Sequence, residues 1–144
     1  MMSSSELEKN TFVKIRAMAL VFLVYAIVPP LLALMFPESG LPASTETSLL
    51  SLVMLLLMPF EIILIYVFYR YFARNPRFKS LVGPAALMYV LATTPSIYAF
   101  VIGMTDSALR MIAIPLGMMF SIVGLWLALM LLSKIPRIQH TFDY

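Results

Sequence analysis

The chain has 144 residues, 62% of them hydrophobic and 12% charged, with a formal net charge of +3. This composition lies outside the usual range of soluble domains, and the length leaves room for one compact unit. Cysteine is absent, which excludes disulfides, thiolate metal sites and thiol redox chemistry.

Four apolar runs of at least 20 residues follow one another along the chain. At 1.5 Å per residue, each is long enough to cross a hydrocarbon core of about 30 Å. The runs are Ala17–Phe36, Leu49–Tyr69, Leu81–Met104 and Met111–Ser133. We therefore predict an all-α, polytopic integral membrane protein in which residues 1–144 form a single domain, with four transmembrane helices in an antiparallel bundle.

The first 16 residues are polar and read as a short amphipathic or frayed lead-in to the first run. The run is too long for the apolar region of a typical signal peptide, and a second span follows after a short loop. We expect it to be retained as the first transmembrane helix. Pro29 and Pro30 should bend this helix or end its regular part, because proline lacks the backbone donor and clashes with the preceding turn.

The distribution of basic residues predicts the orientation of the chain. Residues 37–48 contain no Lys or Arg, whereas residues 70–79 contain four. Short segments rich in Lys and Arg stay on the cytoplasmic side. We therefore predict an N-in/C-in, multi-pass protein of the cell membrane, with residues 1–16 and 134–144 as polar cytoplasmic ends. Only Arg110 falls on the opposite side, with Glu38, Glu46 and Asp106.

The basic segment 70–79 is explained mainly by this topology, so we expect no nucleic-acid partner. Contact with anionic lipid headgroups is a reasonable second role for it. Tyr66, Tyr69 and Tyr71 nearby fit an interfacial aromatic belt, as does Trp126 in the fourth run. The single histidine, His140, lies in the polar tail and is interpreted as a solvated residue, so no metal site is predicted.

Small residues recur at helical spacing in the last two runs. They are Ala92, Ser96, Ala99 and Gly103 in the third run, and Gly117, Ser121, Gly124 and Ala128 in the fourth. Such spacing places each set on one stripe of its helix, and small stripes allow helices to approach closely in lipid. We predict that the two stripes face each other or a partner helix, and we favour packing within the chain over a separate dimerisation motif.

Glu61 is the only acidic residue inside any of the apolar runs, and it follows Pro59 closely. An ionised carboxylate at this depth costs about 3 kcal/mol on insertion scales, so it should be protonated, paired, hydrated or turned into the bundle. The hydroxyls of Thr93, Thr94 and Ser96 flank Pro95 at a similar depth on the next helix. We hypothesise a small polar site formed by Glu61, Thr93, Thr94 and Ser96 that binds a proton or a small cation.

The alternative is that Glu61 is a protonated acid hydrogen-bonded to a neighbouring helix, where it serves packing alone. Transporters and pumps usually carry more than one intramembrane ionisable residue, and the runs supply one. Both interpretations leave room for a polar group from a partner subunit.

The segment from Glu61 to Tyr66 resembles the carboxylate-x-x-x-Ile-Tyr segment of the ion-binding helix in rotor-ring proteolipids of ATP synthases and vacuolar-type ATPases. Residues 93–102 repeat this cadence with Thr93 in the place of the carboxylate, and Ala73-Arg74-Asn75-Pro76 is similar to the polar hairpin loop. The resemblance implies a duplicated proteolipid with one protonatable site at Glu61.

No nucleotide loop, Ser-His-Asp set, paired carboxylates or metal-ligand cluster is present in the sequence. We therefore expect a non-enzymatic integral membrane protein without a cofactor. Its partners would be the lipid bilayer and other membrane-protein subunits or further copies of itself. It would act as an accessory or structural subunit of a larger complex or as a homo-oligomer. The alternative is a proton- or cation-handling protein that uses Glu61.

Overall fold

The computed structural model describes residues 4–35, 48–74 and 81–135. They form four α-helices: α1 (Ser4–Met35), α2 (Leu49–Arg74), α3 (Val82–Thr105) and α4 (Ser107–Leu132). Each helix is long and apolar enough to cross a membrane. The predicted all-helical fold with four membrane-length helices is confirmed for this part of the chain.

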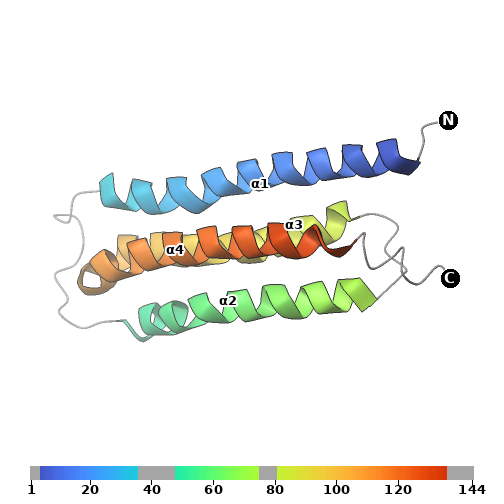
Figure 1. The fold of residues 1–144 in the computed structure, drawn as a ribbon. Coiled ribbons are helices and arrows are strands. Elements are labelled where there is room, and N and C mark those ends of the chain that lie inside the picture. The colour runs from blue at the N-terminus through green and yellow to red at the C-terminus, as the bar shows by residue number, and fades with distance from the viewer. Residues whose placement is uncertain (1–3, 36–47, 75–80, 136–144) are drawn as a thin grey trace.

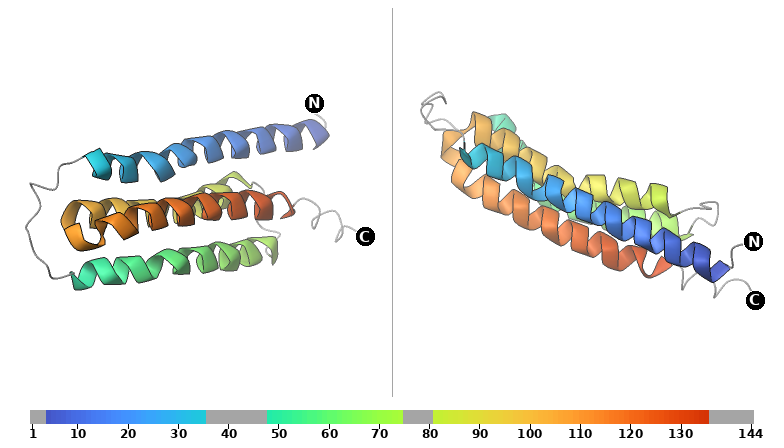
Figure 2. Two further views of the ribbon diagram at one scale, coloured as in Figure 1. Left: turned by 60° about the vertical axis from the view of Figure 1, so that its left-hand side comes forward. Right: turned by 90° about the horizontal axis from the view of Figure 1, so that it is seen from above.

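The helices α3 and α4 lie together in the middle of the molecule, and α1 and α2 flank them on opposite sides (Figures 1 and 2). Half of the most apolar stretch of α3 is buried, compared with 22% for α1 and for α2. Helix α3 is therefore the most deeply buried of the four helices. The N-terminal end of α1 and the C-terminal end of α4 lie at the same end of the molecule (Figure 1).

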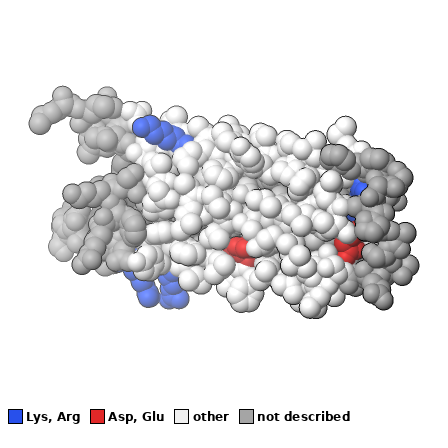
Figure 3. Space-filling model, turned by 180° about the vertical axis from the view of Figure 1, so that it is seen from behind, with Lys and Arg blue, Asp and Glu red and all other residues white. Residues whose placement is uncertain are grey.

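Charged side chains divide the described surface into two ends (Figure 3). We call one the basic end, which carries Arg16, Arg70, Arg74 and Lys134. We call the other the Asp106 end, where α3 gives way to α4. Between the two ends most of the visible surface is uncharged, as expected for helices whose sides face lipid.

The helices extend beyond the predicted runs at several ends, and α4 begins at Ser107 rather than at Met111. Helix α1 begins at Ser4 rather than after a separate lead-in, and α2 continues to Arg74. Helix α1 also passes through Pro29 and Pro30 to Met35, so the prolines do not end it. Transmembrane helices tolerate proline where neighbouring groups satisfy the freed carbonyls, and α3 provides such a group to α1.

The small-residue stripes of α3 and α4 meet along the middle of the molecule. A Cβ atom added at Gly117 would lie 2.6 Å from the carbonyl oxygen of Pro95. One added at Gly124 would lie 3.2 Å from the Cβ of Ala92 and 3.3 Å from the Cδ1 of Ile65 on α2. The absence of side chains at these glycines thus allows three helices to approach one another closely.

Three segments that carry sequence-based predictions lie outside the described residues, wholly or in part. They are residues 37–47 of the acidic loop, residues 75–79 of the basic segment, and the tail from residue 136, which includes His140.

Candidate intramembrane polar site

Helix α2 turns one stripe toward the α3–α4 pair, and Glu61 belongs to this stripe. Its buried residues are Ser51, Met58, Glu61 and Ile65, which recur at helical spacing. The side chain of Glu61 is 8% exposed. It lies midway along α2, and Figure 3 shows acidic atoms halfway along the molecule, surrounded by uncharged surface.

One oxygen of the Glu61 carboxyl group has a partner and the other has none among the described residues. The hydroxyl group of Tyr98 on α3 donates to Glu61 Oε1 at 3.3 Å. Glu61 Oε2 is buried and receives no hydrogen bond within the described part of the chain. A buried polar atom without a partner is costly, so a proton, a cation or a donor from another helix would stabilise this oxygen.

The predicted partners Thr93 and Thr94 bond to their own helix instead. Thr93 Oγ1 donates to the carbonyl oxygens of Tyr89 at 3.1 Å and Val90 at 3.0 Å, and Thr94 Oγ1 donates to that of Val90 at 2.9 Å. Hydroxyl groups in helices commonly bond to a carbonyl one turn back in this way. Neither threonine is hydrogen-bonded to Glu61, so their predicted role in an ion site remains a hypothesis.

Ser96, the third predicted partner, faces α1 and α4 rather than α2. Its hydroxyl donates to the carbonyl oxygen of Ala26 at 2.6 Å and lies 2.8 Å from Ser121 Oγ. Its backbone N–H also donates to Ser121 Oγ, at 3.0 Å. Ala26 O is the carbonyl that the missing N–H of Pro30 leaves without its helical partner. We call this arrangement the serine layer; it joins α1, α3 and α4.

Tyr89 makes a further bond between helices, nearer the basic end. Its hydroxyl donates to the carbonyl oxygen of Ile15 on α1 at 3.2 Å, and both residues are buried. The Tyr89 ring also packs against Phe22, with ring centroids 5.7 Å apart. Helix α1 is thus fixed to α3 at two depths.

Asp106 organises the opposite end of the molecule. Its Oδ1 accepts the N–H groups of Ala108 and Leu109, both at 3.1 Å, and so caps α4. Its Oδ2 accepts the N–H of Ser48, just before α2, at 3.1 Å. Burial raises the pKa of Asp106, but these bonds and one from the Ser51 hydroxyl outweigh burial and hold the pKa below its ordinary value.

Arg110 lies one turn after Asp106 and is buried. Its guanidinium group donates through Nη2 to the carbonyl oxygen of Ala33. Ala33 belongs to the last turn of α1, where carbonyl groups lack helical partners and the helix dipole favours a cation. Arg110 therefore caps the end of α1 from α4.

The described part of the basic segment 70–79 forms the end of α2. Arg70 and Arg74 are exposed and, with Tyr66, Val67 and Tyr71, line a shallow pocket of about 440 Å³. This combination of aromatic and basic side chains suits the predicted contact with anionic headgroups, which remains a prediction.

One of these contributions, the cap formed by Asp106, has a signal in the sequence. An aspartate directly before a helix is a common N-cap, so the capping role of Asp106 follows from its position. Tyr98 lies in the Ile-Tyr pair of residues 93–102. Its bond to Glu61 depends on the rotation of α2 relative to α3, which residue spacing does not specify.

Within the described residues, no group of three His, Cys, Asp or Glu side chains is placed to hold a metal ion. The chain matches no protein-family model, no curated protein and no solved structure.

Proposed function

We propose that the chain is a non-enzymatic integral membrane subunit that acts by packing against other helices, in a larger complex or as a homo-oligomer. The observation that carries this proposal is the use of interior polar groups. Five interior polar residues each form a hydrogen bond between elements that are distant in the sequence. They are Tyr89, Ser96, Ser121, Asp106 and Arg110. Such bonds hold the four helices in one arrangement. A subunit that packs against other helices needs this, because its outer surface must keep a fixed shape.

The proposed arrangement is an antiparallel bundle with both ends in the cytoplasm of the cell. The accumulation of Lys and Arg at the basic end supports this orientation, because such residues are retained on the cytoplasmic side. The shared position of the N-terminal end of α1 and the C-terminal end of α4 agrees with it.

The outward faces of α1 and α2 are the surfaces available to partners. The small-residue stripes of α3 and α4 pack within the chain at Gly117 and Gly124, so they do not offer a free dimerisation face there. On α2, Phe60 and Ile63 are exposed on either side of Glu61. A partner helix on this face would pack beside Glu61, whose buried Oε2 lacks a donor among the described residues.

Photo-crosslinking in native membranes tests this proposal. A photoreactive amino acid is placed at Phe60 or Ile63 of α2 and, as a matched pair, at Val21 or Val24 of α1; all four side chains are exposed. We expect protein adducts from the α2 positions and mainly lipid adducts from the α1 positions. Lipid adducts alone at all four positions would argue against a protein partner.

The half-satisfied carboxyl group of Glu61 favours a second candidate function, proton or cation handling. We propose Glu61 and Tyr98 as its chemical core, since the Tyr98 hydroxyl donates to one carboxyl oxygen while the other has no donor among the described residues. Residues Thr93, Thr94 and Ser96 would then act only after rearrangement of their present bonds. The resemblance of residues 61–66 to rotor-ring proteolipids points in the same direction.

Ion flux into liposomes tests the second candidate function, proton or cation handling, separately from the proposed role in helix packing. The reconstituted chain should carry a proton or cation flux that Glu61→Gln abolishes and Tyr98→Phe reduces. Thr105→Val is the control, because the Thr105 hydroxyl donates to the carbonyl oxygen of Val101 on its own helix at 2.8 Å and is not a member of the proposed site. A flux that is absent, or equal in Glu61→Gln and the unaltered chain, eliminates this candidate.

A further inference from the structure

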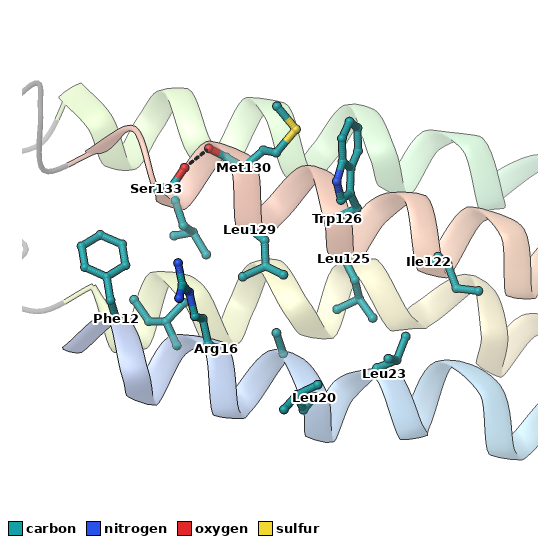
Figure 4. A pocket seen from close by; sticks show the side chains of 13 residues that line it. Phe12, Arg16, Leu20, Leu23, Ile122, Leu125, Trp126, Leu129, Met130 and Ser133 are labelled. Carbon is teal, nitrogen blue, oxygen red and sulfur yellow. Dashed lines mark hydrogen bonds between the residues drawn. The ribbon is translucent and has the colours of Figure 1, made fainter. Parts of the chain in front are cut away.

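A groove of about 660 Å³ runs between α1 and α4 in the half of the molecule nearest the basic end. Its walls are mainly aliphatic, with Leu20 and Leu23 on α1 facing Leu125 and Leu129 on α4 (Figure 4). The volume falls within the range of about 300–1,000 Å³ that is typical of ligand pockets. A groove with such walls between membrane-length helices suits a hydrocarbon chain.

A single cationic side chain lines the groove. Arg16 is exposed and points from α1 into the space between the two helices (Figure 4). The acidic side chains that the structure describes are Glu61, midway along the molecule, and Asp106, at the opposite end. Neither of these two described carboxyl groups lies at the Arg16 end of the groove, where an anion could meet the guanidinium group.

The order of these groups along the groove matches the order within a phospholipid. Arg16 lies where α1 approaches the basic end, and the aliphatic walls continue from it toward the middle of the molecule. Basic pockets between transmembrane helices on the cytoplasmic side are known to bind anionic headgroups. Arginine suits a phosphate group because its planar fork donates two parallel hydrogen bonds.

We propose that the groove between α1 and α4 binds an anionic phospholipid, with one acyl chain against Leu23, Leu125 and Leu129 and the phosphate on Arg16. This site is distinct from the predicted headgroup contact at residues 70–79, which involves α2. It does not depend on the proposed association with other subunits.

The only tryptophan of the chain, Trp126, is among the residues that line this groove and is 62% exposed, so its fluorescence reports on lipid in and next to the groove. The full chain is reconstituted in vesicles of phosphatidylcholine and phosphatidylglycerol, with bromine atoms on the acyl chains of one lipid at a time. Bromine quenches tryptophan on contact. We expect brominated phosphatidylglycerol to compete for the site about fivefold better than brominated phosphatidylcholine, the preference that one basic side chain gives near a membrane surface.

Arg16→Gln should abolish this preference, and Arg16→Lys should retain part of it. Lys14→Gln is the matched control: it removes an equal charge two residues away from an exposed position that does not line the groove. An equal loss in Lys14→Gln and Arg16→Gln would overturn the proposal, because general surface attraction would then explain the preference. Equal quenching by both lipids in the unaltered chain would also overturn it. So would the absence of quenching, which is expected if a second copy of the chain fills the groove.

Discussion

The serine layer and the Glu61–Tyr98 contact lie on different sides of α3, two residues apart, and they use polar groups in opposite ways. Ser96 and Ser121 are fully buried, and their hydroxyls and the Ser96 N–H bond across three helices. Glu61 makes one long bond to Tyr98 and keeps a second buried oxygen without a donor. A completed polar network fixes a bundle, whereas an incomplete one leaves a group that can bind something else.

The largest effect is expected where the helices that carry the serine layer approach most closely. Gly117→Ala places a Cβ against the backbone of Pro95, which cannot move aside as a flexible side chain would. The substitution should lower the free energy of unfolding by about 3 kcal/mol, at the upper end of overpacking costs. Thermal unfolding in detergent, followed by circular dichroism, measures this change.

Gly83→Ala is the matched control for Gly117→Ala. A Cβ at Gly83 meets no atom within 4 Å, so alanine should stabilise α3 by about 0.5–1 kcal/mol through its helix propensity. Similar destabilisation by both substitutions would show that α3 and α4 do not pack at Gly117.

The cap at the Asp106 end should give the next largest effect, and it depends on pH. Because the pKa of Asp106 is lowered in the folded chain, its ionised form adds stability above the ordinary aspartate pKa of about 3.9. This stability is lost as the pH falls through the lower, folded-state pKa. Asp106→Ala should cost up to about 2 kcal/mol at pH 7, the upper value for an N-cap.

Asp106→Asn tests the charge separately from the cap. Asparagine caps helices about as well as aspartate, so this variant should keep most of the stability at pH 7. It should lose less stability than the unaltered chain when unfolding is measured at pH 3 instead of pH 6. An identical acid loss in both proteins would assign the pH dependence to other carboxyl groups.

Removal of the serine layer should have a smaller effect. Ser96→Ala deletes the donor to Ala26 and the contact with Ser121, and hydrogen bonds between helices in membranes average about 0.6 kcal/mol, with a maximum near 1.7. A loss of about 1–2 kcal/mol is therefore expected from thermal unfolding. Ser121→Ala added to Ser96→Ala should cost less than the sum of the two single changes, because both residues share one network.

The smallest change in stability is expected at Glu61. Glu61→Gln preserves an acceptor for Tyr98 and removes the ionisable group, so the free energy of unfolding should change by less than about 0.5 kcal/mol. Reaction with a hydrophobic carbodiimide should modify Glu61 of the unaltered chain in a pH-dependent manner, because one oxygen of its carboxyl group receives no hydrogen bond from the described residues. Lack of labelling at every pH would indicate a closed structural acid.

The sequence predicted the helical class and the membrane-length helices because apolar runs of at least 20 residues have few other stable structures in lipid. It also indicated that Gly117 and Gly124 lie on a packing stripe, since their spacing matches the helical period. Of the two effects predicted for Pro29 and Pro30, a bend or an end of the regular helix, the end is wrong, because α1 continues to Met35. The low helix propensity of proline does not show that the hydroxyl of Ser96, on a helix distant in the sequence, donates a hydrogen bond to the carbonyl oxygen of Ala26 that Pro30 leaves free.

The composition of the Glu61 site was harder to predict. Thr93, Thr94 and Ser96 have a suitable depth and chemistry, but depth does not specify which face of α3 each residue occupies. Tyr98 faces Glu61, whereas Ser96 faces α1 and α4. The rotation of one helix against another depends on packing across the whole bundle, which residue spacing within one helix does not encode.

The most direct test of association through helix packing is the mass of the particle taken from native membranes. The full chain is extracted into polymer-bounded bilayer discs and its protein mass is determined by native mass spectrometry. Association predicts a particle that contains this chain together with further copies of it or with another polypeptide. A particle that holds one copy of the chain and only lipid would contradict it.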